Sequence, residues 1–317
     1  MATYIGIHGT QVRNASSDPS NPIDGQIWYN STSNEFKGYT SVNSWASATS
    51  MNTARAYLGG AGTQTSALGF GGEPGSGTAD ATELYNGTNW TEVNNLTTTR
   101  RNVGGCGASN TAALCVGGYP GFVAITESWN GTNWTEVNDL NTGRRNMGVA
   151  GTNTAALACA GNGPSFSTMD ETETWNGTNW TEVNDLNTAR GELGAVGTNT
   201  AALAFGGTGG PPLLAITELW NGTNWTEVND LNNGRHYLTG AGISTLAIAF
   251  GGVEPGGDTE TWNGTNWTAQ TGLSTARNAL AGAGTQAAAL GFGGEGPPIT
   301  AVTEAWNGNA TVTVTTS

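Results

Sequence analysis

Arginine recurs at a fixed distance from tryptophan along most of this chain, and it is the first residue type whose spacing indicates chemistry. A guanidinium makes paired hydrogen bonds to carboxylates and donates to backbone carbonyls. Because a residue repeated in every unit is more typical of structure, we expect each arginine to satisfy backbone carbonyls or the Glu of the Glu-x-Trp motif in the next unit. The arginines stand ten residues after six tryptophans, at Arg55, Arg100, Arg144, Arg190, Arg235 and Arg277.

The residue directly after each arginine differs from unit to unit, and this makes it a better ligand-binding candidate than the arginine itself. Three of these residues are charged or titratable: Arg101, Arg145 and His236. Large apolar residues in nearby Pro- and Gly-rich loops join them as candidates, because exposed aromatic side chains on stiff loops are costly unless they bind something. Simple drift of loop sequences is the alternative. The loop candidates are Tyr119, Phe122, Phe166, Leu213 and Leu214.

Residues for catalysis or metal binding are few. The chain has two histidines and three cysteines, and none has the spacing of a metal site or a Ser-His-Asp triad. We therefore expect no enzyme activity, no cofactor and no metal. Cys106 and Cys115 are expected to be buried free thiols, with a disulfide between them as the alternative.

Composition excludes several classes of protein. The formal net charge is −14 and only 11% of the 317 residues are charged, so the chain lacks the basic surface of a nucleic-acid binder. We find no apolar run of about 18 residues and no secretory signal, so membrane insertion is not expected. Twelve tryptophans indicate a folded core despite the 50 glycines.

A tandem repeat organises the chain. The string W-N-G-T-N-W-T-E-V-N begins at Trp129, Trp175 and Trp220, and the second tryptophans of successive units are 44, 46, 45 and 42 residues apart. Each unit also contains an apolar run that ends in Gly-Gly or Ala-Gly. A period near 44 with about four strand signals and no helical periodicity predicts the blade of a β-propeller.

The Asn-Gly pair inside each unit predicts a hairpin. A two-residue type I′ turn would place Glu127 opposite Trp134, whereas a four-residue loop would place Glu127 opposite Glu136. Like charges that face each other directly are unfavourable. We therefore favour the two-residue turn, with a cation between the carboxylates as the alternative. Both registers put the two tryptophans on one face, where we expect them to pack between blades.

The order of arginine, apolar strand, Gly-Gly, aromatic residue and tryptophan resembles the Kelch repeat over roughly residues 46–317. The resemblance implies an all-β, six-bladed Kelch-like propeller with four antiparallel strands per blade, and arginines near a central pore where they can bind acidic ligands. The W-N-G-T-N-W hairpin is tighter than is usual in the family, and Ala160 replaces one glycine.

The first 45 residues are different. The stretch Asp18 to Tyr39 is similar to segments of tail-fibre and virion proteins of marine tailed bacteriophages. This resemblance implies an attachment segment (1–40) that contacts other virion proteins, a propeller (41–317), a location in the virion tail or fibre, and recognition of a host surface glycan or protein. The alternatives are a structural virion adaptor or decoration protein, and a cellular Kelch scaffold or glycan-active enzyme.

Loop variation and ring closure complete the expectations. The loops between the second and third strands vary most among the units, so we expect the ligand-binding face there, on the same side as the arginines. For the last blade, either the segment around Trp45 or the tail Thr311–Thr315 supplies the outer strand. A seventh partial blade from the N-terminal strands is a further alternative.

Overall fold

The computed structural model describes residues 12–19, 26–40, 43–164, 167–253, 256–308 and 310–313. Over this part of the chain the protein is all-β, with no helix that could cross a membrane. Its strands form seven four-stranded sheets. The chain divides into two compact units: Ser44–Trp306, and Met1–Asn43 together with Asn307–Ser317.

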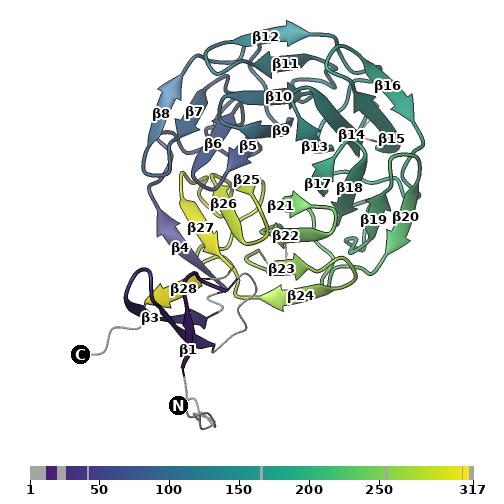
Figure 1. The fold of residues 1–317 in the computed structure, drawn as a ribbon. Helices are drawn as coiled ribbons and strands as arrows, with labels where there is room; N and C mark the ends of the chain where they lie inside the picture. Colours follow the sequence, from purple (N-terminus) through teal and green to yellow (C-terminus); the bar gives the residue numbers. More distant parts are fainter. Residues whose placement is uncertain are drawn as a thin grey trace. The chain divides into compact units, whose positions relative to one another are not determined.

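Six sheets belong to the larger unit and are arranged as a ring (Figure 1). The repeated four-stranded antiparallel sheets form a β-propeller-like fold. In five of them the four strands follow one another along the chain. These strands are β5 (Gly59–Thr63), β6 (Ser66–Phe70), β7 (Thr82–Tyr85) and β8 (Trp90–Val93); β9 (Gly104–Ser109), β10 (Ala112–Val116), β11 (Thr126–Trp129) and β12 (Trp134–Val137); β13 (Gly148–Thr152), β14 (Ala155–Asn162), β15 (Thr168–Trp175) and β16 (Trp180–Val183); β17 (Gly194–Thr198), β18 (Ala201–Phe205), β19 (Thr217–Trp220) and β20 (Trp225–Val228); β21 (Thr239–Ile243), β22 (Leu246–Phe250), β23 (Thr259–Trp262) and β24 (Trp267–Gln270).

The sixth sheet joins the two ends of the repeat region. It contains β25 (Ala281–Gly284), β26 (Ala288–Phe292), β27 (Thr303–Asn307) and, next to β27, β4 (Ser44–Ala48). Trp45 on β4 is buried, its ring lies 5.5 Å from that of Trp306, and its indole N–H donates to Thr259 Oγ1 at 2.9 Å. The Trp45 segment is therefore the outer strand of this sheet, which decides between the two alternatives left open by the sequence.

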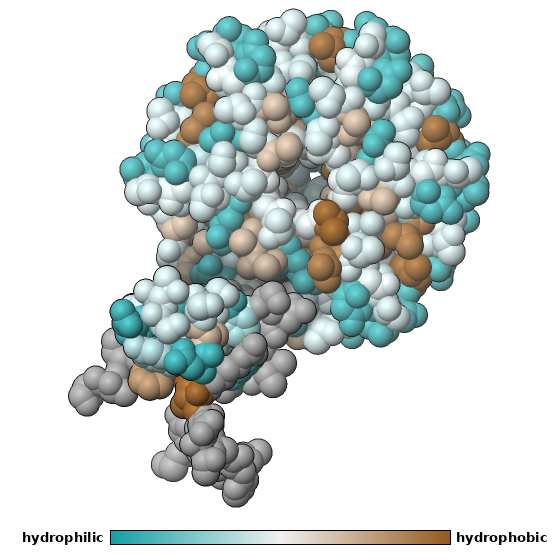
Figure 2. Space-filling view, viewed as in Figure 1, coloured by the Kyte–Doolittle hydropathy of each residue, from teal (hydrophilic) through white to brown (hydrophobic). Residues whose placement is uncertain are grey.

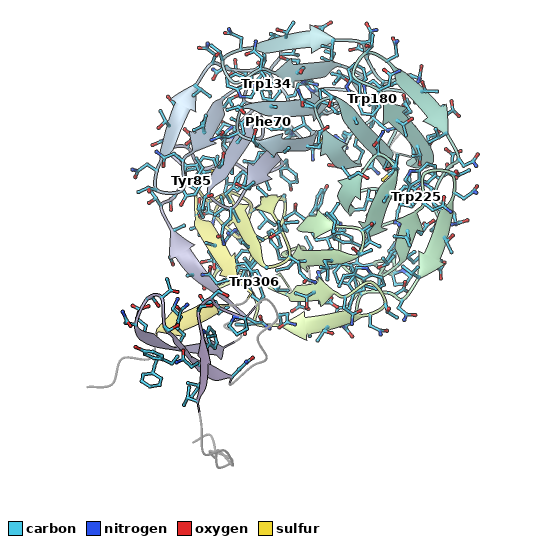
Figure 3. The ribbon with its side chains drawn as sticks, in the orientation of Figure 1. Phe70, Tyr85, Trp134, Trp180, Trp225 and Trp306 are labelled. Atoms are coloured by element: carbon cyan, nitrogen blue, oxygen red, sulfur yellow. The ribbon has the colours of Figure 1, made fainter. Side chains whose placement is uncertain are left out.

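The core lies between neighbouring sheets and is built from repeated aromatic side chains (Figure 3). Trp129 and Trp134 have ring centroids 5.4 Å apart, on one face of their sheet. The indole N–H of Trp134 crosses to the preceding sheet and donates to Thr82 Oγ1 at 3.0 Å. Phe70 of the same preceding sheet lies 4.9 Å from Trp134. These contacts confirm that the tryptophans pack between sheets.

The hairpin register differs from the expected two-residue turn. Trp129 pairs with Trp134 and Glu127 with Glu136, so four residues form the loop. The Asn130 side-chain oxygen accepts from the backbone N–H groups of Thr132 and Asn133, both at 2.9 Å, and this stabilises the longer loop. The expected repulsion is avoided because Glu127 is buried on the guanidinium of Arg100, while Glu136 is exposed.

Small residues allow the innermost strands to approach closely. A Cβ atom on Gly105 of β9 would lie 2.8 Å from the backbone nitrogen of Gly60 on β5. A Cβ on Gly60 would lie 2.9 Å from the carbonyl oxygen of Gly282 on β25. Glycine at these positions therefore sets how tightly the sheets close around the centre of the ring.

The smaller unit holds the seventh sheet, in the order β1 (Arg13–Ala15), β2 (Ile27–Asn30), β3 (Glu35–Thr40) and β28 (Ala310–Thr313). β1 and β2 are parallel, and the other pairs are antiparallel. Asp18 accepts hydrogen bonds from the side chains of Trp28, Asn30 and Lys37 at 3.0, 2.7 and 3.1 Å. These hydrogen bonds hold the pKa of the Asp18 carboxyl below its ordinary value.

Candidate functional site

The six repeated arginines lie inside the sheets and are not available to a ligand. All six are fully buried and each pairs with a buried glutamate of its own unit, not of the next unit as expected. Arg55 also donates to the carbonyl oxygens of Gly71 and Ala81 at 2.8 and 2.6 Å. The N···O distances are 3.0 Å for Arg55–Glu83, 2.8 Å for Arg100–Glu127, 3.2 Å for Arg144–Glu173, and 2.5 Å for Arg190–Glu218, Arg235–Glu260 and Arg277–Glu304.

A ring of backbone hydrogen bonds lies two residues after these arginines. At each position the N–H donates to the carbonyl oxygen of the equivalent residue in a neighbouring sheet, over 2.8–3.0 Å, and the series returns to its start. All six residues have positive φ, between 51° and 63°, which non-glycine residues seldom adopt. We call this set the mouth ring: Tyr57, Asn102, Asn146, Glu192, Tyr237 and Ala279.

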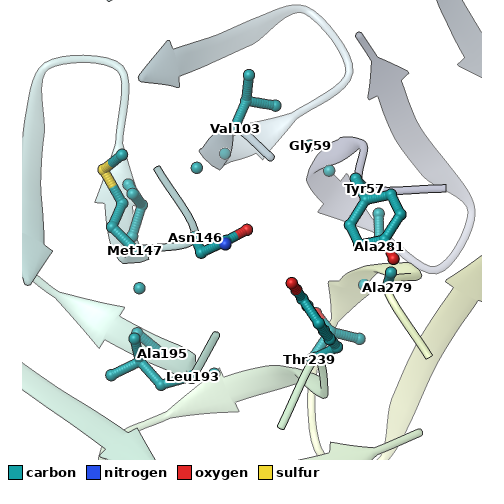
Figure 4. A pocket seen from close by; sticks show the side chains of 18 of the residues that line it. Tyr57, Gly59, Val103, Asn146, Met147, Leu193, Ala195, Thr239, Ala279 and Ala281 are labelled. Carbon is teal, nitrogen blue, oxygen red and sulfur yellow. The ribbon is translucent and has the colours of Figure 1, made fainter. Parts of the chain in front are cut away.

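The mouth ring lines a cavity of about 140 Å³ at the centre of the larger unit. Figure 2 shows an opening at the centre of the ring of sheets. In Figure 4, Tyr57 and Asn146 lie on opposite sides of the cavity, and Thr239 lies between them around its edge. The side chains of the mouth ring differ from sheet to sheet, so the cavity is chemically asymmetric.

The variable loops begin beside this ring. The residue after each buried arginine forms an isolated β-bridge with the residue that follows Gly-Gly, for example Arg101 with Tyr119. This pairing places the start of each variable loop next to the segment that leads into an innermost strand. Loops and mouth ring therefore share one face.

Four of the predicted ligand-binding residues come together on that face. The Arg101 guanidinium carbon lies 4.9 Å from the ring centre of Tyr119, and that of Arg145 lies 5.3 Å from both Tyr119 and Phe122. Arg101 also pairs with Glu73 of the neighbouring sheet. We call Arg101, Tyr119, Phe122 and Arg145 the arginine–aromatic cluster. It joins residues from two adjacent sheets.

The other predicted residues lie elsewhere. His236 Nδ1 is 2.5 Å from Glu192 Oε2, on a different side of the mouth ring. Leu213 and Leu214 are half-buried in the loop between β18 and β19, two sheets away from Tyr119. Phe166 lies outside the described residues.

The sequence interpretation missed Tyr57, Glu192 and Tyr237. Tyr57 and Tyr237 have ring centres 5.3 Å apart, and the Tyr57 hydroxyl donates to Glu295 Oε2 at 2.8 Å. Burial is the main reason why the pKa of Tyr57 is raised, and the hydrogen bond to Glu295 raises it further. Burial, followed by the charge of Glu192, raises the pKa of Tyr237. Comparing units at the second residue after each arginine would have revealed these side chains, because they vary as the first residue does.

The cysteines take no part in this site. Cys106, Cys115 and Cys159 are buried free thiols, so the disulfide alternative is not formed. Burial raises the pKa of each thiol to about 12. Among the residues that the structure describes, no cluster of His, Cys, Asp and Glu is suited to hold a metal ion.

Comparison with protein-family models and with curated proteins finds no match for this chain. What the geometry defines is the class of architecture, a β-propeller-like repeat fold with an asymmetric polar cavity at its centre.

Proposed function

We propose that this chain is a virion protein of a tailed bacteriophage, a tail fibre or receptor-binding component that recognises a ligand on the host surface. In this proposal the six sheets of the larger unit are the blades of a six-bladed Kelch-like propeller. The cyclic series of hydrogen bonds among six equivalent residues supports six blades. The seventh sheet contains a parallel pair and belongs to the other compact unit, so it is not counted as a blade.

The observation that carries the recognition role is the arginine–aromatic cluster. Two guanidinium groups lie over the rings of Tyr119 and Phe122. The side chain of Arg101 is 27% exposed to solvent. Partly exposed arginine and aromatic side chains are the residues that dominate binding energy at interfaces. The cluster lies in loops whose sequences differ from unit to unit. Such differences are expected of a surface that binds one particular ligand.

The attachment role rests on the resemblance of Asp18 to Tyr39 to phage virion segments. Residues 1–40 would contact other virion proteins, and the variable loops would face the host surface glycan or protein. We expect no catalysis, no cofactor, no nucleic acid and no membrane insertion.

The first test is electron microscopy of the intact particle together with adsorption of the purified full-length chain to host cells. The chain is expected at the tail or fibre with its variable loops exposed, and the free protein is expected to adsorb to host cells and block infection. Double substitution Tyr119→Ala and Arg145→Gln should abolish adsorption. Ile243→Thr, at the end of β21 where the equivalent residue of β5 is Thr63, is the matched control and should leave adsorption unchanged.

Burial of the variable loops against other viral subunits would contradict the recognition role. It would favour the alternative of a structural adaptor or decoration protein.

A further inference from the structure

The two sides of the mouth ring carry opposite chemistry. In the sheets that start with β9 and β13, the two residues after the buried arginine are Arg101–Asn102 and Arg145–Asn146. In the sheets that start with β17, β21 and β5, the same positions supply a carboxylate, an imidazole and phenols. We call this second set the acidic–aromatic side; it consists of Tyr57, Glu192, His236 and Tyr237, with Glu295 beside them.

The aromatic rings of this side form a connected series. His236 and Tyr237 have ring centres 4.9 Å apart, and Tyr237 and Tyr57 are 5.3 Å apart with an interplanar angle of 80°. A carboxylate lies at each end of the series. Glu192 contacts the imidazole of His236, and Glu295 accepts a hydrogen bond from the Tyr57 hydroxyl. Aromatic faces beside carboxylates are the combination that attracts an ammonium group.

The acidic–aromatic side remains accessible from the cavity. The side chain of His236 is 19% exposed to solvent and that of Glu192 is 14% exposed. Tyr57, Glu192 and Tyr237 all line the cavity of about 140 Å³. A cavity of this size admits the end of a ligand.

The backbone fixes where these side chains stand. Positive φ is costlier for tyrosine and glutamate than for asparagine, whose short polar side chain tolerates this conformation. Asn102 and Asn146 show that the ring accepts asparagine, at φ of 54° and 55°. Tyr57, Glu192 and Tyr237 occupy the equivalent positions at φ of 56°, 63° and 54°. The ring of hydrogen bonds imposes this φ on all six members, Ala279 included at 51°, so the positions fix where the larger side chains stand around the cavity.

We propose that the acidic–aromatic side of the mouth ring binds an ammonium group at the end of a surface glycan, of the kind an amino sugar carries. The ammonium would lie against the faces of Tyr57 and Tyr237 and beside the Glu192 carboxylate. This proposal rests on the proposed recognition of a host glycan and names its chemical class.

The test is calorimetric titration of the full-length protein with D-glucosamine, at a pH where its amine is protonated. N-acetyl-D-glucosamine is the matched probe, because a neutral amide replaces the ammonium on the same sugar. We expect glucosamine to bind at least about tenfold more tightly than the N-acetyl sugar, within the range that a partly desolvated cation–π contact gives.

Two variants locate the site. Tyr237→Asn keeps a residue type that the ring already holds at positive φ, and Glu192→Gln keeps the side-chain shape without its charge. Each should weaken glucosamine binding about tenfold, whereas Ile243→Thr should leave it unchanged. Circular dichroism confirms that each variant is folded.

Equal binding of both sugars, or unchanged glucosamine binding in both variants, would overturn the proposal. Binding of D-glucuronate in place of glucosamine, lost in Arg145→Gln, would assign the site to the arginine–aromatic cluster and would also overturn it. Cell adsorption without glucosamine binding refutes this inference alone. Glucosamine binding without cell adsorption refutes the proposed function and leaves the site standing.

Discussion

Glu218 and Glu227 lie directly opposite each other on β19 and β20, yet only one of them needs a partner. Glu218 is fully buried, 2.5 Å from the Arg190 guanidinium, and also accepts from the backbone N–H of Asn187 at 2.8 Å. Glu227, on the outermost strand, is exposed to solvent. The strand register therefore places two carboxylates opposite each other, but an arginine neutralises the buried one and solvent surrounds the other.

Removing one partner of this buried pair should be strongly destabilising. Glu218→Gln leaves the Arg190 charge buried without its counter-charge, and we expect a loss of about 3–5 kcal/mol in the free energy of unfolding. Urea denaturation of the full chain measures this loss. Glu227→Gln, the residue opposite, is the matched control and should change stability by no more than about 0.5 kcal/mol. Equal effects of the two variants would contradict the assigned role of Glu218.

Truncation at two neighbouring points should distinguish the two units. Deleting residues 1–40 leaves β4 in place, so the larger unit should keep its melting temperature. Deleting residues 1–48 removes Trp45 and the outer strand of the sixth sheet, and should lower the melting temperature or prevent folding. Thermal melting followed by tryptophan fluorescence measures both. A large loss in the shorter deletion would show that the larger unit depends on residues 1–40.

Adding one methyl group at the centre of the ring should open it. Gly105→Ala would place its Cβ 2.8 Å from the backbone nitrogen of Gly60, which cannot move without shifting β5. We expect a cost of about 1–3 kcal/mol. Gly257→Ala, whose nearest neighbour is 3.5 Å away, should be close to neutral in the same denaturation experiment.

The thiols should be unreactive in the folded protein. The pKa of Cys106, Cys115 and Cys159 is raised from the ordinary value of 9.0 to about 12. The folded chain therefore keeps protons that the unfolded chain loses, so this contribution to stability is complete below about pH 9 and is lost as the pH rises toward 12. Labelling with a disulfide reagent at pH 8 should find no reactive thiol until denaturant is added. Rapid labelling of the native protein would refute the burial of these cysteines.

The repeating sheets were predictable because tandem copies display their own period. Six arginines at a constant distance from tryptophan fix the unit even where Tyr85 replaces a tryptophan. Their structural role also followed from repetition, although the partner glutamate lies in the same unit and not the next. The variable residues Arg101 and Arg145 became candidates because they break the pattern that surrounds them.

Other features were beyond pairwise sequence rules. The predicted hairpin register was wrong because the rule against facing carboxylates considers only the two paired strands. Arg100, 27 positions before Glu127 in the sequence, donates a hydrogen bond to its carboxylate and compensates its charge. The mouth ring was missed because residue type does not predict a positive φ at tyrosine or glutamate, and because the units were compared only at the first residue after each arginine. The choice of Trp45 over the tail depended on contacts of residues more than 200 positions apart.

The cyclic hydrogen bonds of the mouth ring take one residue from each of the six units. With one donor and one acceptor per unit, a circle of five or seven members would need a different angle between every pair of neighbours. Near-identical units can therefore exchange loop segments with one another at constant circumference, whereas gain or loss of a whole unit would disturb all interfaces at once. The architecture lets the chemistry of the loops differ among positions while the number of positions stays fixed.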